Sequence, residues 1–138
     1  MTQENNSSQQ QAQTLIALLQ QQRSVYENLD ELSKRQSQLI DSDDTAGLLD
    51  LLARRQKVVE RLAELNVKFE PFKRSWADFW EPLEEGTQAK IQELIGQVQS
   101  MVDRIMAQDE KDHARMAQIR DRMARDAGRL QQGATVNR

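Results

Sequence analysis

The sequence predicts an all-α fold, an antiparallel up-and-down helical bundle or coiled coil of three long helices plus a short, proline-bounded one. Apolar residues recur at three- and four-residue spacing along most of the chain, which places them on one face of a helix. The 138 residues include only five glycines and two prolines, so there are few breaks. Charged residues make up 30% and hydrophobic residues 38%, a balance typical of helix-rich domains.

The first helix is expected from Leu15 to about Ile40, because apolar residues occupy the two core positions of a heptad repeat there. These residues are Leu15, Leu18, Val25, Leu29, Leu32 and Leu39. Gln22 and Gln36 interrupt the seam, and we interpret both as edge residues whose amides reach solvent. Residues 1–12 are rich in Asn, Ser and Gln without an apolar period, and they predict a disordered lead-in.

The second helix is expected to open at about Thr45, after the turn Asp-Ser-Asp-Asp at 41–44. The stretch Leu48–Leu65 has the widest apolar stripe, so it is expected to be the element around which the other helices pack. The three aspartates are interpreted as helix-capping residues. A calcium loop is disfavoured because Leu52 stands where such a loop needs a bidentate Glu.

Aromatic residues and prolines mark the next segment. Pro71 cannot donate a backbone hydrogen bond, so the second helix is expected to end or kink near Phe69. A short third helix is then expected from Pro71 to Pro82. Five of the six aromatic residues fall between positions 69 and 80. We interpret them as a plug at one end of the bundle rather than a ligand pocket, since no set of polar groups converges on them.

The last helix is expected to start near Gln88 with Thr87 as its N-cap. Its apolar stripe is dense from Ile91 to Met106 and thins beyond, where the core is expected to have run out. At about 1.5 Å per residue, a helix from 88 to 128 is on the order of 60 Å long, against about 40 Å for the first. Its end should therefore overhang the bundle.

An overhanging helix with a narrow apolar ridge has the form that a partner groove accepts, and methionine adapts to irregular surfaces. A frayed, solvated helix end is the alternative. The candidate partner-binding residues are Met106, Met116, Ile119, Met123 and Leu130. The expected organisation is one helical domain at 13–130 between the disordered lead-in at 1–12 and a disordered tail at 131–138.

No catalytic or metal-binding constellation can be assembled, so neither enzymatic activity nor a cofactor is expected. His113, the single histidine, lies in a charged run and is interpreted as a surface residue. The net charge of −3 is mixed in sign, which disfavours nucleic acid as a partner. Five arginines between positions 115 and 129 are interrupted by Asp121 and Asp126, so they form at best a weak nucleic-acid stripe.

The cellular compartment is expected to be the cytoplasm. No run approaches the roughly 18 apolar residues that a membrane span needs, so no stable membrane insertion is expected. The polar start of the chain also lacks the basic and apolar regions of a signal peptide. The sequence contains no cysteine, which fits a reducing compartment.

The order of these features resembles the FlgN family of flagellar export chaperones over residues 12–130. The resemblance is carried by a Gln-rich start, a Leu-rich helix with Tyr26, an acidic turn, and the run Leu-Leu-Asp-Leu-Leu-Ala-Arg-Arg-Gln-Lys at 48–57. It implies a cytoplasmic chaperone that binds secreted hook-filament junction subunits and delivers them to the type III export apparatus. It also implies that the last helix is the cargo end.

The sequence departs from the family pattern in that helix. Many members carry an Asn-Gly-x-Leu-Ile type of segment where this chain has Gln-Asp-Glu-Lys-Asp at 108–112. No aromatic residue follows Trp80, so the tail offers no aromatic anchor for the export gate. The alternative function is a helical adaptor or scaffold that homodimerises through the last helix or binds a partner that is not secreted.

Overall fold

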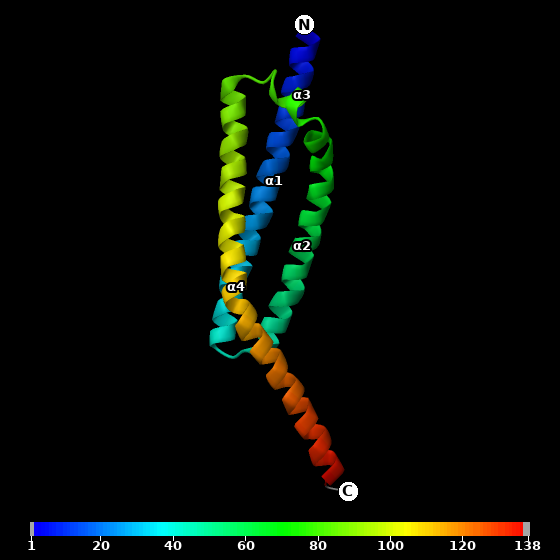
Figure 1. Cartoon of the computed structure of the whole chain (residues 1–138), viewed down its shortest axis with the longest axis vertical. Helices are drawn as coiled ribbons and strands as arrows, with labels where there is room; N and C mark the ends of the chain where they lie inside the picture. The colour runs from blue at the N-terminus through cyan, green and yellow to red at the C-terminus, as the bar shows by residue number, and fades with distance from the viewer. Residues whose placement is uncertain (1, 137–138) are drawn as a thin grey trace.

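A computed structural model describes the backbone of residues 2–136 and the side chains of residues 7–129. Over this range the chain forms four helices and no strand. They are α1 (Thr2–Asp41), α2 (Thr45–Arg74), α3 (Trp76–Trp80) and α4 (Glu85–Val136). Figure 1 shows the three long helices side by side, with α2 antiparallel to α1 and to the start of α4. The predicted all-α bundle is confirmed.

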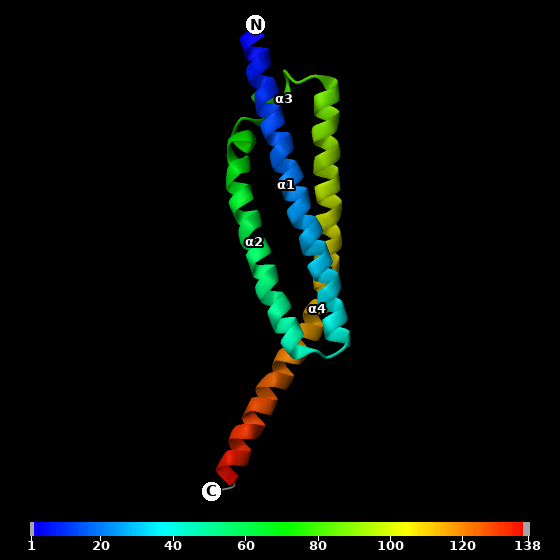
Figure 2. The ribbon, with the colours of Figure 1, turned by 180° about the vertical axis from the view of Figure 1, so that it is seen from behind.

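Helix α1 is the middle helix of the bundle. It packs closely on both α2 and α4, whereas α2 and α4 approach each other much less closely, as the opposite views of Figures 1 and 2 show. The expectation that Leu48–Leu65 would be the centre is therefore wrong. The stripe of α2 is narrower than its sequence indicates, because Val59 is 43% exposed and Leu52 is only half-buried.

The end of the bundle near α3 is closed by aromatic residues. Phe69 and Phe79 are buried in the hydrophobic core, and Phe72 meets Phe79 edge-on with ring centroids 5.3 Å apart. Trp76 stacks on Trp80 at 5.2 Å and keeps one side toward solvent. This arrangement agrees with the plug interpretation of the cluster, because its largest apolar surfaces cover one another.

Two helix boundaries in this region differ from the expected ones. Helix α2 continues through Pro71 to Arg74, so of the two expected alternatives near Phe69 the helix end is wrong, and the kink stays a prediction. The proline is exposed, and its missing N–H removes only the bond to the carbonyl of Val67. The short helix consequently begins at Trp76 rather than at Pro71.

The starts of the first and last helices also lie earlier than expected. Helix α1 begins at Thr2 instead of Leu15, since polar residues without an apolar period do not by themselves break a helix. Ala12, inside that polar stretch, is buried in the core. Helix α4 begins at Glu85, which places Thr87 within its first turn and not at its N-cap. The domain bounds of 13 and 130 stay a prediction.

Candidate partner-binding surface

A layer of buried polar side chains crosses the bundle between α1 and α4. Gln36 is 2% exposed and Asp112 is 1% exposed. The carboxylate of Asp112 accepts hydrogen bonds from the Oγ of Ser37 at 2.7 Å and from the Nε2 of Gln108 at 3.2 Å. The same Nε2 of Gln108 also donates to the Oγ of Ser37 at 2.6 Å. The Nε2 of Gln36 donates to Asp112 at 3.4 Å, so each of these four side chains has a polar partner in the other helix.

Arg55 brings α2 into this polar layer. Its Nη1 donates to the Oε1 of Gln36 at 2.8 Å, and its Nη2 forms an ion pair with Asp109 of α4. The side chain of Arg55 is only 16% exposed. One guanidinium therefore connects all three long helices, in the fork geometry that lets arginine hold two acceptors at once.

The polar layer corrects two expectations. The edge interpretation is wrong for Gln36, which is buried and hydrogen-bonded, while Gln22 is half-buried. The core also does not end at Met106, because it continues to Asp112 in polar form. The sequence did carry a signal, since polar residues interrupt the seams of two helices that pack together. Matching Gln36 with Gln108 and Asp112 would have indicated a buried network.

Beyond the polar layer, α4 contacts the turn between α1 and α2 through two ion pairs. Arg115 pairs with Asp41, and Arg122 pairs with Asp43. Asp44 alone caps α2, with its Oδ1 accepting from the backbone N–H of Gly47 at 3.0 Å. The capping interpretation is thus confirmed for Asp44 and wrong for the other two aspartates, which hold α4 against the turn.

Two of the predicted partner-binding residues lie at this junction, on the face of α4 that continues from the core. Met116 is half-buried, and its Sδ accepts a hydrogen bond from the Nε2 of Gln36 at 3.5 Å. Ile119 is half-buried and shares with Ile40 a groove of about 540 Å³. Met123 follows on the same face and is 41% exposed. We call Met116, Ile119 and Met123 the α4 stripe.

The other two predicted residues stand apart from the α4 stripe. Met106 is 64% exposed, and ten residues of helix before Met116 rotate it by roughly 80° from that face. The side chain of Leu130 lies outside the described residues. The structure therefore brings together three of the five predicted residues and does not bring Met106 to them.

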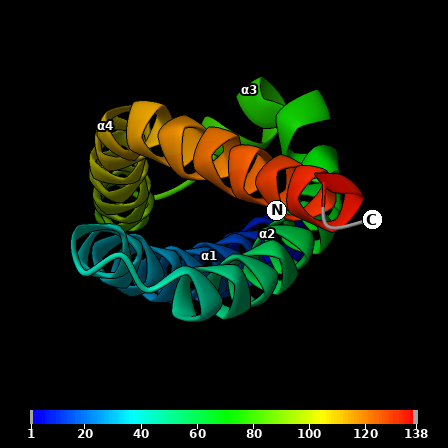
Figure 3. The ribbon, with the colours of Figure 1, turned by 90° about the horizontal axis from the view of Figure 1, so that it is seen from below.

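The end of α4 leaves the bundle, as the sequence predicts. Figures 1 and 2 show its orange and red part passing the turn and projecting beyond it. From below, Figure 3 shows this part crossing the open end of the bundle. All side chains from 123 to 129 are exposed. The overhang, defined here as the part of α4 after Arg122, thus starts later than expected.

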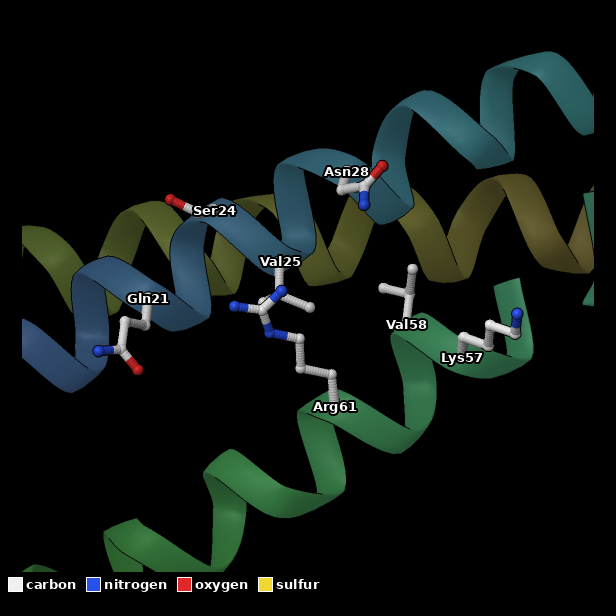
Figure 4. A pocket seen from close by; sticks show the side chains of 7 residues that line it. All are labelled: Gln21, Ser24, Val25, Asn28, Lys57, Val58 and Arg61. Carbon is white, nitrogen blue, oxygen red and sulfur yellow. The ribbon is translucent and has the colours of Figure 1, made fainter. Parts of the chain in front are cut away.

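The remaining surface offers weaker candidates. A hollow of about 440 Å³ lies between α1 and α2, and Figure 4 shows the polar ends of its lining side chains pointing in different directions. Such a lining does not converge on a ligand. His113 is exposed, as expected. Within residues 7–129 no three His, Asp or Glu side chains are grouped so that they could hold a metal ion.

In the described part of the chain, no helix combines the length and the apolar composition that crossing a bilayer requires.

Searches of curated proteins and of solved structures give no match. A family model described as FlgN protein matches residues 1–137, which is nearly the whole chain and includes the helical hairpin, the polar layer and the α4 stripe. The chain therefore belongs to the FlgN family of flagellar export chaperones.

Proposed function

We propose that this chaperone binds secreted hook-filament junction subunits in the bacterial cytoplasm and brings them to the type III export apparatus. Family membership supports the general role. The observation that supports the binding site is the α4 stripe, which leaves the core at the half-buried Met116 and continues to Met123, a residue that is 41% exposed. An apolar stripe that continues past its own bundle is suited to a helical partner.

The mechanism is sequestration without chemistry. A junction subunit prone to self-assembly would place the apolar face of an amphipathic helix on the α4 stripe, so that this face is covered until export. Each fully buried apolar side chain contributes roughly 1.5 to 3 kcal/mol. Three such contacts contribute at most about 5 to 9 kcal/mol before the entropic cost of association is subtracted, which is compatible with a complex that dissociates at the export apparatus. No enzymatic step, metal or cofactor is part of this proposal.

Leu130 and Met106 have different places in the proposal. Leu130 comes seven residues after Met123, so a continuous helix presents it on the same face. Met106 faces another direction beside the bundle and is proposed only as a second, separate contact. The α4 stripe and Leu130 are thus expected to supply most of the binding free energy.

The test is capture of a purified hook-filament junction subunit by three variants of the full chain. Replacing Met116, Ile119 and Met123 together by Ser should weaken binding by several orders of magnitude, at roughly tenfold or more per lost contact. Met123→Ser with Leu130→Ser should also weaken it, and this variant leaves the contacts between α4 and the bundle untouched. Val67→Ser, at a 70% exposed position of α2, serves as the control and should bind nearly as well as wild type.

The rival is an adaptor that homodimerises through α4. Sedimentation of the free chain distinguishes the two functions. A stable dimer that the Ser variants dissociate, together with no capture of the subunit by wild type, would refute the chaperone proposal. Unchanged capture by the triple Ser variant would remove the α4 stripe from the mechanism.

A further inference from the structure

Two parallel rows of side chains, one of arginines and one of apolar residues, run along α4 from the bundle into the overhang. An arginine and an apolar residue stand next to each other as Arg115 and Met116, and again seven residues later as Arg122 and Met123. The same pair recurs after another seven residues as Arg129 and Leu130. Since seven residues make about two turns, each row stays on nearly the same side of the helix.

Within the protein, the end of α1 already packs against the first part of these two rows. Its apolar residue Ile40 shares the groove with Ile119, and the aspartates that follow pair with Arg115 and Arg122. The structure thus contains one example of what this face of α4 binds. The bound element is an apolar helix end with carboxylates at its flank.

The overhang repeats the positive charge where α1 no longer reaches. Residues 115–129 include five arginines against two aspartates, although the whole chain has a net charge of −3. Arg125 lines the groove beside Ile119 and Arg122. Arg125 and Arg129 are both exposed, and among residues 7–129 neither forms an ion pair. Asp126, between them, also has no ion pair in that range.

We propose that the segment captured by the overhang is an acidic amphipathic helix, with an apolar face that covers the part of the α4 stripe left exposed by the end of α1 and carboxylates at its flank that pair with Arg125 and Arg129. This inference rests on the proposed function and specifies the chemistry of the client segment. The carboxylates would repeat on the partner what Asp41 and Asp43 do within the chain. Charge complementarity of this kind contributes more to selectivity and association rate than to total affinity.

The test measures affinity for the purified hook-filament junction subunit at low and at high salt. Arg125→Glu with Arg129→Glu should weaken binding about tenfold or more at low salt, because two exposed ion pairs become two repulsions. Wild-type affinity should fall as salt rises, and that of the Glu variant should not. Arg125→Lys with Arg129→Lys should bind nearly as wild type. Lys90→Glu, a single charge reversal at an exposed position far from the overhang, is the control.

The outcomes separate this inference from the proposed function. If the triple Ser variant of the α4 stripe loses capture while the double Glu variant binds like wild type at both salt concentrations, the client is not acidic and the inference is wrong, but the chaperone function stands. If neither variant changes capture, both proposals fail. A dimer of the free chain that the Glu variant dissociates would make a second copy the occupant, and would also overturn the inference.

Discussion

Ser37 of α1 donates a 2.7 Å hydrogen bond to Asp112 of α4, a residue 75 positions away in the sequence and only 1% exposed. Toward the α3 end the core is mainly apolar, and in the opposite direction α4 passes the turn and projects beyond the bundle (Figure 1). A hydrogen bond requires a defined donor and acceptor, whereas apolar side chains can slide past one another. The polar layer therefore fixes where α4 stops being part of the apolar core.

Removing the carboxylate of Asp112 should destabilise the fold. Asp112→Ala removes the acceptor of the Ser37 hydroxyl and one of the two acceptors of the Gln108 amide, and an unsatisfied buried group costs about 1 to 3 kcal/mol. We expect a loss of roughly 2 to 4 kcal/mol in urea unfolding, and a smaller one for Asp112→Asn. Asp103→Ala, at an exposed position of the same helix, should change stability by less than about 0.5 kcal/mol. Equal effects at the two positions would contradict the polar layer.

Shortening a side chain to Ala should lower the free energy of unfolding much more in the core than in the overhang. Leu62 is buried in the core, so Leu62→Ala should cost about 2 to 5 kcal/mol. Met123 lies in the overhang with no covering helix, and Met123→Ala should cost under about 1 kcal/mol. Denaturant melts of the two variants provide the measurement. Similar losses would mean that α4 is buried to its end.

The same Gly-to-Ala change should have different results at two helical sites. A Cβ at Gly96 would meet no atom within 4 Å, so Gly96→Ala should stabilise the chain by about 0.5 to 1 kcal/mol. A Cβ at Gly47 would lie 2.6 Å from the Oδ2 of Asp44, the residue that caps α2. Losing that cap costs about 1 kcal/mol, which cancels the gain in helix propensity. A clear stabilisation by Gly47→Ala would argue against the cap.

Hydrogen exchange should locate the point at which α4 becomes free. Amides from about Met123 onward should exchange fast in the free protein, and a bound junction subunit should slow them. Asp41→Asn with Asp43→Asn removes both ion pairs to the turn and should extend fast exchange back toward Arg115. Fast exchange in residues 2–12 would support the predicted domain start at 13. Protection that continues unchanged past Met123 in the free chain would refute the overhang.

The apolar period predicted the helices well, because burial of a stripe is a local requirement that the sequence records directly. It did not predict which helix is central. The central helix is the one that packs against both of the others, and the apolar pattern of a single helix does not show this. A wide stripe such as that of Leu48–Leu65 can stay partly exposed, and Val59 in it is indeed exposed. Two helix ends were also predicted wrongly. The polar residues at the start of α1 and Pro71 in α2 are less favourable in a helix, but they do not force the helix to end there.

The candidate surface was predicted in part. Spacing alone identifies Met116, Ile119 and Met123 as one face of a helix, and the structure places them together. The error at Gln36 has a physical reason, since burying an amide is unfavourable until a partner is known, and its partners Arg55 and Asp112 come from two other helices. The roles of Asp41 and Asp43 were hidden for the same reason, because their arginines lie in α4.

The central position of α1 also has a consequence for the order of assembly during synthesis. Gln36 and Arg55 are 19 positions apart, so the hairpin of α1 and α2 can close while α4 is still being made. The bond between Gln108 and Ser37 spans 71 positions, and closing this longer loop costs about 1 kcal/mol more in chain entropy. Until α4 emerges from the ribosome, one side of α1 is bare. The nascent hairpin therefore exposes an apolar surface, which is covered only when α4 has been synthesised and packs against α1.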